Sequence, residues 1–193
     1  MSTRLEAALA RIDRANAADP RVETSAEGEV PEALLYGRRM SARLERFAPD
    51  ASEALKLAAR AQHIERWRIP RGDYPEGRKG YLAWRRRLYD FHAERARDLL
   101  EEVGYPEEVR ARVATLVKKK GLGRDPEAQC LEDVVCLVFL EHYFAAFAAK
   151  HPDEKVIDIL RKTWAKMSAE GREAALALPL GPERALIERA LAG

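Results

Sequence analysis

The sequence has few cysteines and no long hydrophobic run. Its two cysteines, Cys130 and Cys136, lie in one apolar stretch, and no apolar segment stands at the N-terminus. A secreted fold built on disulfides uses more cysteines, and a membrane-spanning helix needs about 20 consecutive apolar residues. We therefore expect a cytoplasmic protein without a signal peptide and with no membrane partner.

Neither sign of charge is in large excess. The 193 residues include 34 Lys and Arg against 32 Asp and Glu, which gives a formal net charge of +2. A disordered polyelectrolyte or a protein that coats nucleic acid needs a one-sided balance. Because 47% of the residues are hydrophobic, the chain can bury a sizeable core, and its length predicts one domain over residues 1–193.

Strict alternation of polar and apolar residues, which is typical of strands, is missing. Apolar residues instead recur every three to four positions, and the ten prolines and eleven glycines fall almost entirely between these segments. This pattern predicts an all-α fold, a bundle of about eight helices. We expect N-terminal helices within residues 1–49, a core within residues 50–150 and C-terminal helices within residues 151–193.

Proline, glycine and capping residues predict where the helices begin and end. The longer helices are expected over residues 3–16, 31–47, 50–69, 81–103, 106–120 and 126–150, with shorter helices after them, and a polar loop before Pro31. Residues 70–80 hold two prolines and three glycines, and are expected to form an ordered or lid-like loop.

Three titratable residues lie on apolar helix faces. His92 stacks with Leu88 and Ala96 one turn to either side, Asp133 lies on the apolar stripe of its helix, and His63 lies in a segment poor in long polar side chains. Imidazole and carboxylate together are ligands that a divalent transition metal prefers, and helical bundles build such sites from separate helices. The alternative is that all three are structural core residues, each satisfied by a hydrogen bond or an ion pair.

The order His63, His92, Asp133 is similar to the ligand order of the HD-domain metal-dependent phosphohydrolases, which runs His, His-Asp, Asp. Several runs resemble domain-of-unknown-function family 4202 more closely, and this resemblance covers nearly the whole chain. These runs are His63–Trp67, Tyr81–Arg85, His92–Ala93, Leu131–Glu141 and Lys162–Ser168. The closer resemblance itself implies no activity.

The HD resemblance implies an HD-like core in which His63, His92 and Asp133 hold a divalent transition metal ion, one of Mn, Fe, Co, Ni or Zn. One position departs from the HD pattern, because Ala93 stands where the motif has aspartate. Glu132 is the first candidate for the missing ligand or for a general base, with Asp133 beside it as the other catalytic carboxylate. Adjacent helical residues, however, point about 100° apart.

Arginines are concentrated around the two histidines in the sequence. Arg66 lies one turn from His63, Arg71 lies in the expected loop, and Arg78 and Arg85 follow it. Planar guanidinium groups match the oxygens of a phosphate, so we predict that these arginines bind the phosphate of a substrate. The alternative is that they are solvated helix surfaces paired with glutamates.

The leading hypothesis is a metal-dependent phosphohydrolase that acts on a small phosphorylated ligand, a phosphate ester of the nucleotide kind. The alternative is a non-catalytic helical binding module for a phosphorylated ligand or a protein partner. RNA is the less favoured partner, because the triplets Arg85–Arg87 and Lys118–Lys120 are typical of solvated helix surfaces. The run Lys166–Ser168 matches part of a loop of class I aminoacyl-tRNA synthetases, but the chain lacks the alternating strands of that fold.

Overall fold

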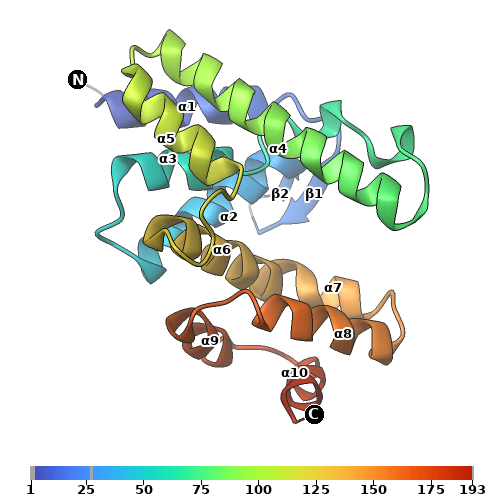
Figure 1. The fold of residues 1–193 in the computed structure, drawn as a ribbon. Helices are drawn as coiled ribbons and strands as arrows, with labels where there is room; N and C mark the ends of the chain where they lie inside the picture. The colour runs from blue at the N-terminus through green and yellow to red at the C-terminus, as the bar shows by residue number, and fades with distance from the viewer. Residues whose placement is uncertain (1–2, 27, 193) are drawn as a thin grey trace. The chain divides into compact units, whose positions relative to one another are not determined.

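Helices make up nearly all of the regular structure (Figure 1). The computed structural model describes residues 3–26 and 28–192, and within these ranges it contains ten α-helices and one two-stranded antiparallel sheet. The expectation of an all-α protein is therefore confirmed. An HD-like core stays a prediction.

Two compact units divide the chain, one over Met1–Lys120 and the other over Gly121–Gly193. The boundary coincides with a glycine-rich turn in which Gly121 and Gly123 have φ angles of 85° and 81°. A positive φ favours glycine, which has no Cβ to clash with the backbone. The core expected within residues 50–150 extends across this boundary, and each unit is described by itself below.

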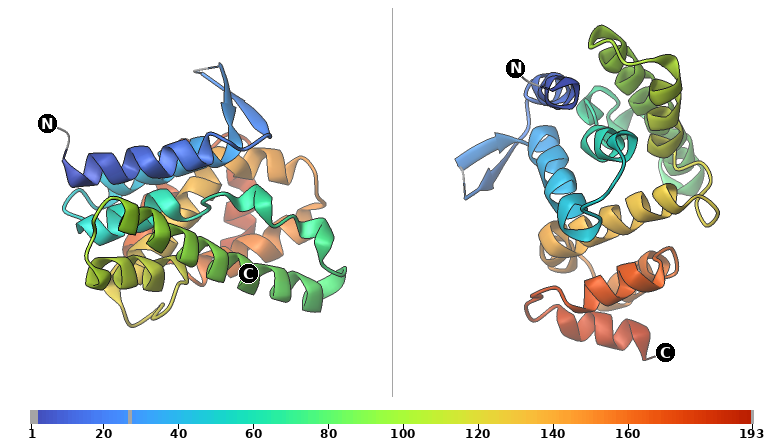
Figure 2. Two further views of the ribbon diagram at one scale, coloured as in Figure 1. Left: turned by 90° about the horizontal axis from the view of Figure 1, so that it is seen from above. Right: turned by 90° about the vertical axis from the view of Figure 1, so that its left-hand side faces the viewer.

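The first unit contains five α-helices and the hairpin in the part of it that is described. Its elements are α1 (Arg4–Asn16), β1 (Val22–Ser25), β2 (Gly28–Pro31), α2 (Glu32–Phe47), α3 (Glu53–Ala61), η1 (Arg66–Arg68), η2 (Arg71–Asp73), α4 (Gly77–Glu102) and α5 (Glu107–Val117). Helix α3 lies against α1, α2 and α5, and α4 runs along α5 (Figure 2). Ile12, Met40, Leu57 and Leu116 fill the space between these helices and are fully buried.

The hairpin corrects the expectation of a polar loop before Pro31. Val22 pairs with Pro31 and Ser25 pairs with Gly28 across the turn. Each strand has only four residues, too few for an alternating pattern to stand out from a loop. Gly28, the first residue of β2, has a φ of 96°, a conformation that favours glycine.

The third helix is shorter than expected. It begins after Ser52, whose hydroxyl accepts a hydrogen bond from the Leu55 amide, and it ends at Ala61. His63 therefore lies in the turn after α3 and not within a helix. Glu65 in this turn has a φ of 47°, a left-handed conformation that ends the helical path.

The loop expected over residues 70–80 is shorter than predicted, because it contains the short helix η2 and because α4 begins at Gly77 and not near residue 81. The Arg71 guanidinium donates to the carbonyl oxygens of Tyr74 and Pro75, at 2.8 and 3.0 Å. The Trp84 indole donates to the Ile69 carbonyl at 2.9 Å. A Cβ atom on Gly80 would lie 1.9 Å from the Pro75 carbonyl oxygen, so only glycine permits this approach.

The second unit contains α6 (Pro126–Val138), a π-helical turn (Phe139–Tyr143), α7 (Phe144–Ala148), α8 (Asp153–Trp164), α9 (Ala169–Leu176) and α10 (Arg184–Leu191). Helix α9 lies against α6, and α10 lies against α8 (Figure 1). The helix expected over residues 126–150 is thus interrupted by a wider turn. Among the described residues, no helix has the length and apolar content to cross a membrane.

Candidate functional site

Two of the predicted metal ligands, His63 and His92, lie together in the first unit. The centroids of their rings are 6.0 Å apart. His92 projects inward from α4 and is 1% exposed. His63 is half-buried and stacks on Tyr36, with ring centroids 4.1 Å apart and planes inclined by 16°. The inward direction predicted for His92 is therefore confirmed.

One hydrogen bond sets the tautomer of His92. Its Nδ1 atom lies 2.7 Å from the Ile64 carbonyl oxygen, which can only accept, so we assign the proton to Nδ1. The other ring nitrogen, Nε2, then carries a lone pair. It is buried and has no hydrogen-bond partner among the described residues. The buried Nε2 atom is thus an open acceptor or ligand position.

Both imidazoles are neutral at physiological pH. Burial, with a further contribution from the positive charge of Arg66, lowers the pKa of His92 to about 3, against the opposing hydrogen bond to Ile64. Burial and the charges of Arg66 and His92 also hold the pKa of His63 well below its usual value. Neutral imidazole is the form that binds a metal ion or accepts a hydrogen bond.

A buried polar network holds the turn that carries His63. The Glu65 amide donates to the Asn16 side-chain oxygen at 2.9 Å. The Glu65 carboxylate accepts two hydrogen bonds from Arg95, at 3.0 and 3.3 Å, and one from Arg68 at 2.9 Å. Sequence reasoning missed these residues because they come from three elements, and nothing in their spacing connects them.

Arg66 is a half-buried cation without a carboxylate partner among the described residues. Its guanidinium lies over the Trp84 ring, 4.7 Å from the centroid, and makes no ion pair there. Burial lowers the pKa of Arg66, and repulsion from Arg85 and Arg21 adds to this effect. The guanidinium is therefore held in place by an aromatic surface and not by an acid.

The other predicted phosphate-binding arginines lie in different settings. The half-buried Arg85 guanidinium lies 5.8 Å from the Tyr81 ring centroid and donates a hydrogen bond to the Tyr89 hydroxyl. Arg71 is bonded to the carbonyl groups of its own loop. Arg78 is exposed on the first turn of α4. The structure thus places Arg66 and Arg85 in the electrostatic surroundings of His63, and gives Arg71 a structural contact.

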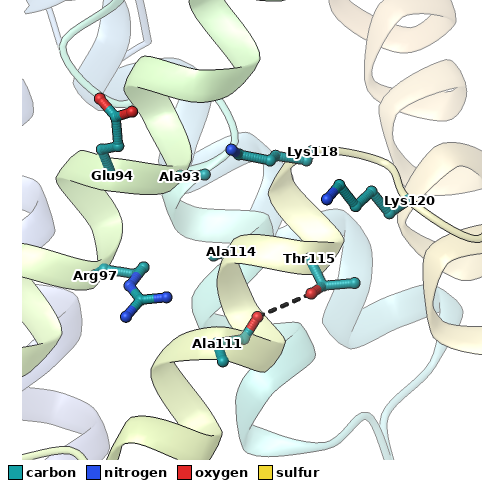
Figure 3. A pocket seen from close by; sticks show the side chains of 8 residues that line it. All are labelled: Ala93, Glu94, Arg97, Ala111, Ala114, Thr115, Lys118 and Lys120. Carbon is teal, nitrogen blue, oxygen red and sulfur yellow. Dashed lines mark hydrogen bonds between the residues drawn. The ribbon is translucent and has the colours of Figure 1, made fainter.

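Ala93, where the HD resemblance predicts an aspartate, is buried beside α5. It lines a groove of about 390 Å³ between α4 and α5 together with Thr115 and Lys118 (Figure 3). The hydroxyl of Thr115 donates to the Ala111 carbonyl, and Lys118 pairs with Asp90 at 2.7 Å. A side chain at position 93 thus points toward α5, about 100° round the helix from His92.

Asp133 and Glu132 lie on α6 in the second unit, 2% and 4% exposed. The burial predicted for Asp133 is confirmed. Its Oδ1 atom accepts hydrogen bonds from the Ser168 amide at 2.9 Å and from the Gln129 side chain at 3.3 Å. Among the described residues it has no arginine partner, so the ion pair considered as the alternative is not what satisfies it. Glu132 lies 3.9 Å from the Lys166 ammonium.

The run Lys166–Ser168 directly precedes α9, and Ser168 is the N-cap of this helix. The Ser168 hydroxyl accepts from the Gly171 amide at 3.0 Å, and the Ser168 amide donates to Asp133. A Cβ atom on Gly171 would lie 2.5 Å from Asp133 Oδ1, so the helix can approach the carboxylate only with glycine there. This run is therefore a helix cap, in agreement with the rejection of a synthetase loop.

The complete ligand set His63, His92, Asp133 and Glu132 stays a prediction. The histidines belong to the first unit and the carboxylates to the second. Within the described part of the chain, no three His, Cys, Asp or Glu side chains gather closely enough to hold a metal ion. What the structure does bring together is the pair of neutral imidazoles with Arg66 and Arg85 beside them.

A family model described as Domain of unknown function (DUF4202) matches residues 6–187. The chain belongs to this family. In the DUF4202 chain the match extends from α1 into α10 and so includes both units. No curated protein and no solved structure gave a match. The comparisons lend no support to the HD resemblance.

The depressed pKa of His92 predicts a loss of stability in acid. The His92 imidazole binds a proton near pH 6.5 in the unfolded chain but only near pH 3 in the folded chain. The free energy of unfolding therefore decreases as the pH falls between these values. By pH 4.5 the loss is roughly 2 to 3 kcal/mol. Urea denaturation of wild type and His92→Gln at pH 7.5 and 4.5 measures it, with His151→Gln as the control. An equal pH dependence in wild type and His92→Gln would contradict the assignment.

The contacts of Asp133 predict different effects for two substitutions. Asp133→Ala removes the acceptor for the Ser168 amide and should lower the free energy of unfolding by about 1 to 2 kcal/mol. Asp133→Asn keeps an oxygen at Oδ1 and should cost much less. Urea denaturation of both variants tests this. Equal destabilisation by the two would show that the negative charge of Asp133, and not its hydrogen bond from the Ser168 amide, matters to the fold.

Proposed function

We propose that this DUF4202 protein is a metal-dependent phosphohydrolase that acts on a phosphate ester, with its substrate phosphate held at Arg66 and Arg85. The observation that carries the proposal is the half-buried Arg66 guanidinium, which lacks a carboxylate partner among the described residues and lies beside two neutral histidines. His63 and His92 are the proposed metal ligands from this unit.

The charge balance around Arg66 favours an anionic ligand. Partial burial of a cation that has no carboxylate partner is unfavourable, and the lowered pKa of Arg66 reflects this burial. A phosphate dianion would offset the charges of Arg66 and Arg85 at once. The flat guanidinium of Arg66 is already oriented by the Trp84 ring, so little side-chain entropy remains to be lost on binding.

The geometry of His92 is consistent with metal ligation. Donation from Nδ1 to a backbone carbonyl fixes the ring and presents the lone pair of Nε2, which is the usual arrangement of a ligating histidine. A divalent transition ion, when bound, would polarise a phosphoryl oxygen and activate a water molecule. Asp133 and Glu132 are the proposed carboxylate ligands, and Glu132 is also the proposed general base.

A second candidate function is non-catalytic binding of a phosphorylated ligand. Ala93 favours it, because this position supplies no carboxylate and faces the α4–α5 groove. The cationic surroundings of His63 also favour an anion over a lone metal ion. In this alternative Arg66 makes the same contact to phosphate, but no hydrolysis follows.

Two paired measurements test these functions. Calorimetric titration with adenosine monophosphate should show affinity about tenfold or more weaker for Arg66→Ala than for wild type, since a charge-assisted hydrogen bond contributes about 1.5 to 3 kcal/mol. Arg86→Ala, which removes an exposed cation from α4, should leave the binding of this small ligand unaffected. Equal effects of the two substitutions would contradict a phosphate site at Arg66.

Elemental analysis of protein purified without an affinity tag then separates the enzyme from the binding module. The enzyme should contain about one equivalent of Mn, Fe, Co, Ni or Zn and release phosphate from monoesters only in that form. Protein that binds adenosine monophosphate yet takes up none of these ions would contradict the hydrolase and support the binding module.

A further inference from the structure

The first turns of α4 carry an excess of positive charge, of which only Arg87 pairs with an acid, Glu94, in the described part of the chain. Residues 77–89 include five Lys or Arg and no Asp or Glu. Arg78, Lys79 and Arg86 are exposed, and among the described residues none of these three side chains makes an ion pair or a hydrogen bond. In a chain with a net charge of only +2, this is a local concentration of charge.

Two large apolar side chains are exposed among these cations. Tyr81 is 42% exposed and Leu82 is 51% exposed. At about 100° per residue, Arg78, Leu82 and Arg86 follow one line along the helix, with Lys79 and Tyr81 on either side of it. We call the surface formed by Arg78, Lys79, Tyr81, Leu82 and Arg86 the α4 face.

The α4 face continues into the proposed phosphate site. The Tyr81 ring lies 5.9 Å from the Trp84 ring and 5.8 Å from the Arg85 guanidinium. The Arg66 guanidinium lies over the same Trp84 ring. From Arg78 to Arg86 the helix rises about 12 Å, a length greater than one phosphate group. A ligand that covers this face therefore carries several negative charges along its length.

We propose that the α4 face binds a single-stranded nucleic acid, so that the phosphate ester of the proposed function is the terminal phosphate of a strand. This inference rests on the proposed function and specifies its substrate class. Arg78, Lys79 and Arg86 contact successive backbone phosphates, and a base stacks on Tyr81. Cations with an interleaved aromatic ring are the combination by which proteins bind single strands without sequence preference.

A membrane surface fits the same face less well. A helix that lies on a bilayer inserts a continuous apolar side, whereas α4 exposes only Tyr81 and Leu82. Its apolar side, with Leu88, Ala96 and Leu99, is buried within the protein. The balance of many cations against few apolar groups favours a hydrated polyanion over lipid.

Fluorescence anisotropy with a labelled 5′-phosphorylated 12-nucleotide strand, in DNA and RNA forms, tests the inference. We expect the strand to bind at least tenfold more tightly than adenosine monophosphate binds in calorimetry. For three phosphate contacts its affinity should fall about twentyfold between roughly 50 and 200 mM salt. A strand that binds no more tightly than the mononucleotide would overturn the inference and leave the proposed function intact.

Matched variants identify the surface. Lys79→Ala combined with Arg86→Ala should weaken strand binding at least tenfold while leaving adenosine monophosphate binding unchanged, and Tyr81→Ala should weaken strand binding about tenfold. The control combines Arg14→Ala with Lys150→Ala, which removes the same charge from two other exposed positions. Equal losses in the two double variants would overturn the inference, because the charge effect would then be general.

Two further outcomes separate the two proposals. If Arg66→Ala leaves adenosine monophosphate binding intact while Lys79→Ala with Arg86→Ala still abolishes strand binding, the proposed function fails and the α4 face is supported. Binding to phosphatidylserine vesicles, with no binding to either strand, would assign the face to a membrane and overturn the inference.

Discussion

The hydrogen bond between His92 and the Ile64 carbonyl is the contact on which the candidate site depends. It joins α4 to the turn after α3, so the two histidines meet although they lie 29 positions apart in the sequence. It also determines that Nε2 is the ring nitrogen left without a hydrogen-bond partner among the described residues. The turn exists because Glu65 adopts a left-handed conformation, and Asn16 and Arg95 hold that conformation through hydrogen bonds. Strain held by a polar network is a common basis for a functional site.

The two histidines lie in positively charged surroundings. Burial and, after it, the charge of Arg66 lower the pKa of both histidines. The Arg66 guanidinium itself lies over an aromatic ring and not beside an acid. In the proposed function the substrate supplies the missing negative charge, so binding relieves a cost that the free protein carries. The same reasoning extends along α4, where the exposed Arg78, Lys79 and Arg86 make no ion pair among the described residues.

Much of the fold follows from local patterns, whereas the site does not. Prolines predicted the end of α1 and the start of α2, and glycines predicted the breaks after α4 and α5, because these signals act within a few residues. The hairpin was missed because four-residue strands carry too little alternation. The inward direction of His92 and Asp133 followed from helical periodicity. Their partners could not be predicted, because the Ile64 carbonyl and the Ser168 amide are backbone groups that tertiary packing brings close. The sequence also could not separate Arg71 from Arg66, because the two arginines differ only in their contacts in the fold.

The ¹⁵N resonances of the imidazole nitrogens test whether His92 presents a neutral Nε2 atom without a hydrogen-bond partner at the proposed phosphate site. With four histidines in the chain, a long-range ¹H–¹⁵N spectrum resolves each ring. At pH 6 we expect His92 to be neutral with its proton on Nδ1, and its Nε2 resonance to shift when adenosine monophosphate is added. A proton on Nε2, or resonances of His63 and His92 that do not change with the ligand, would contradict the account.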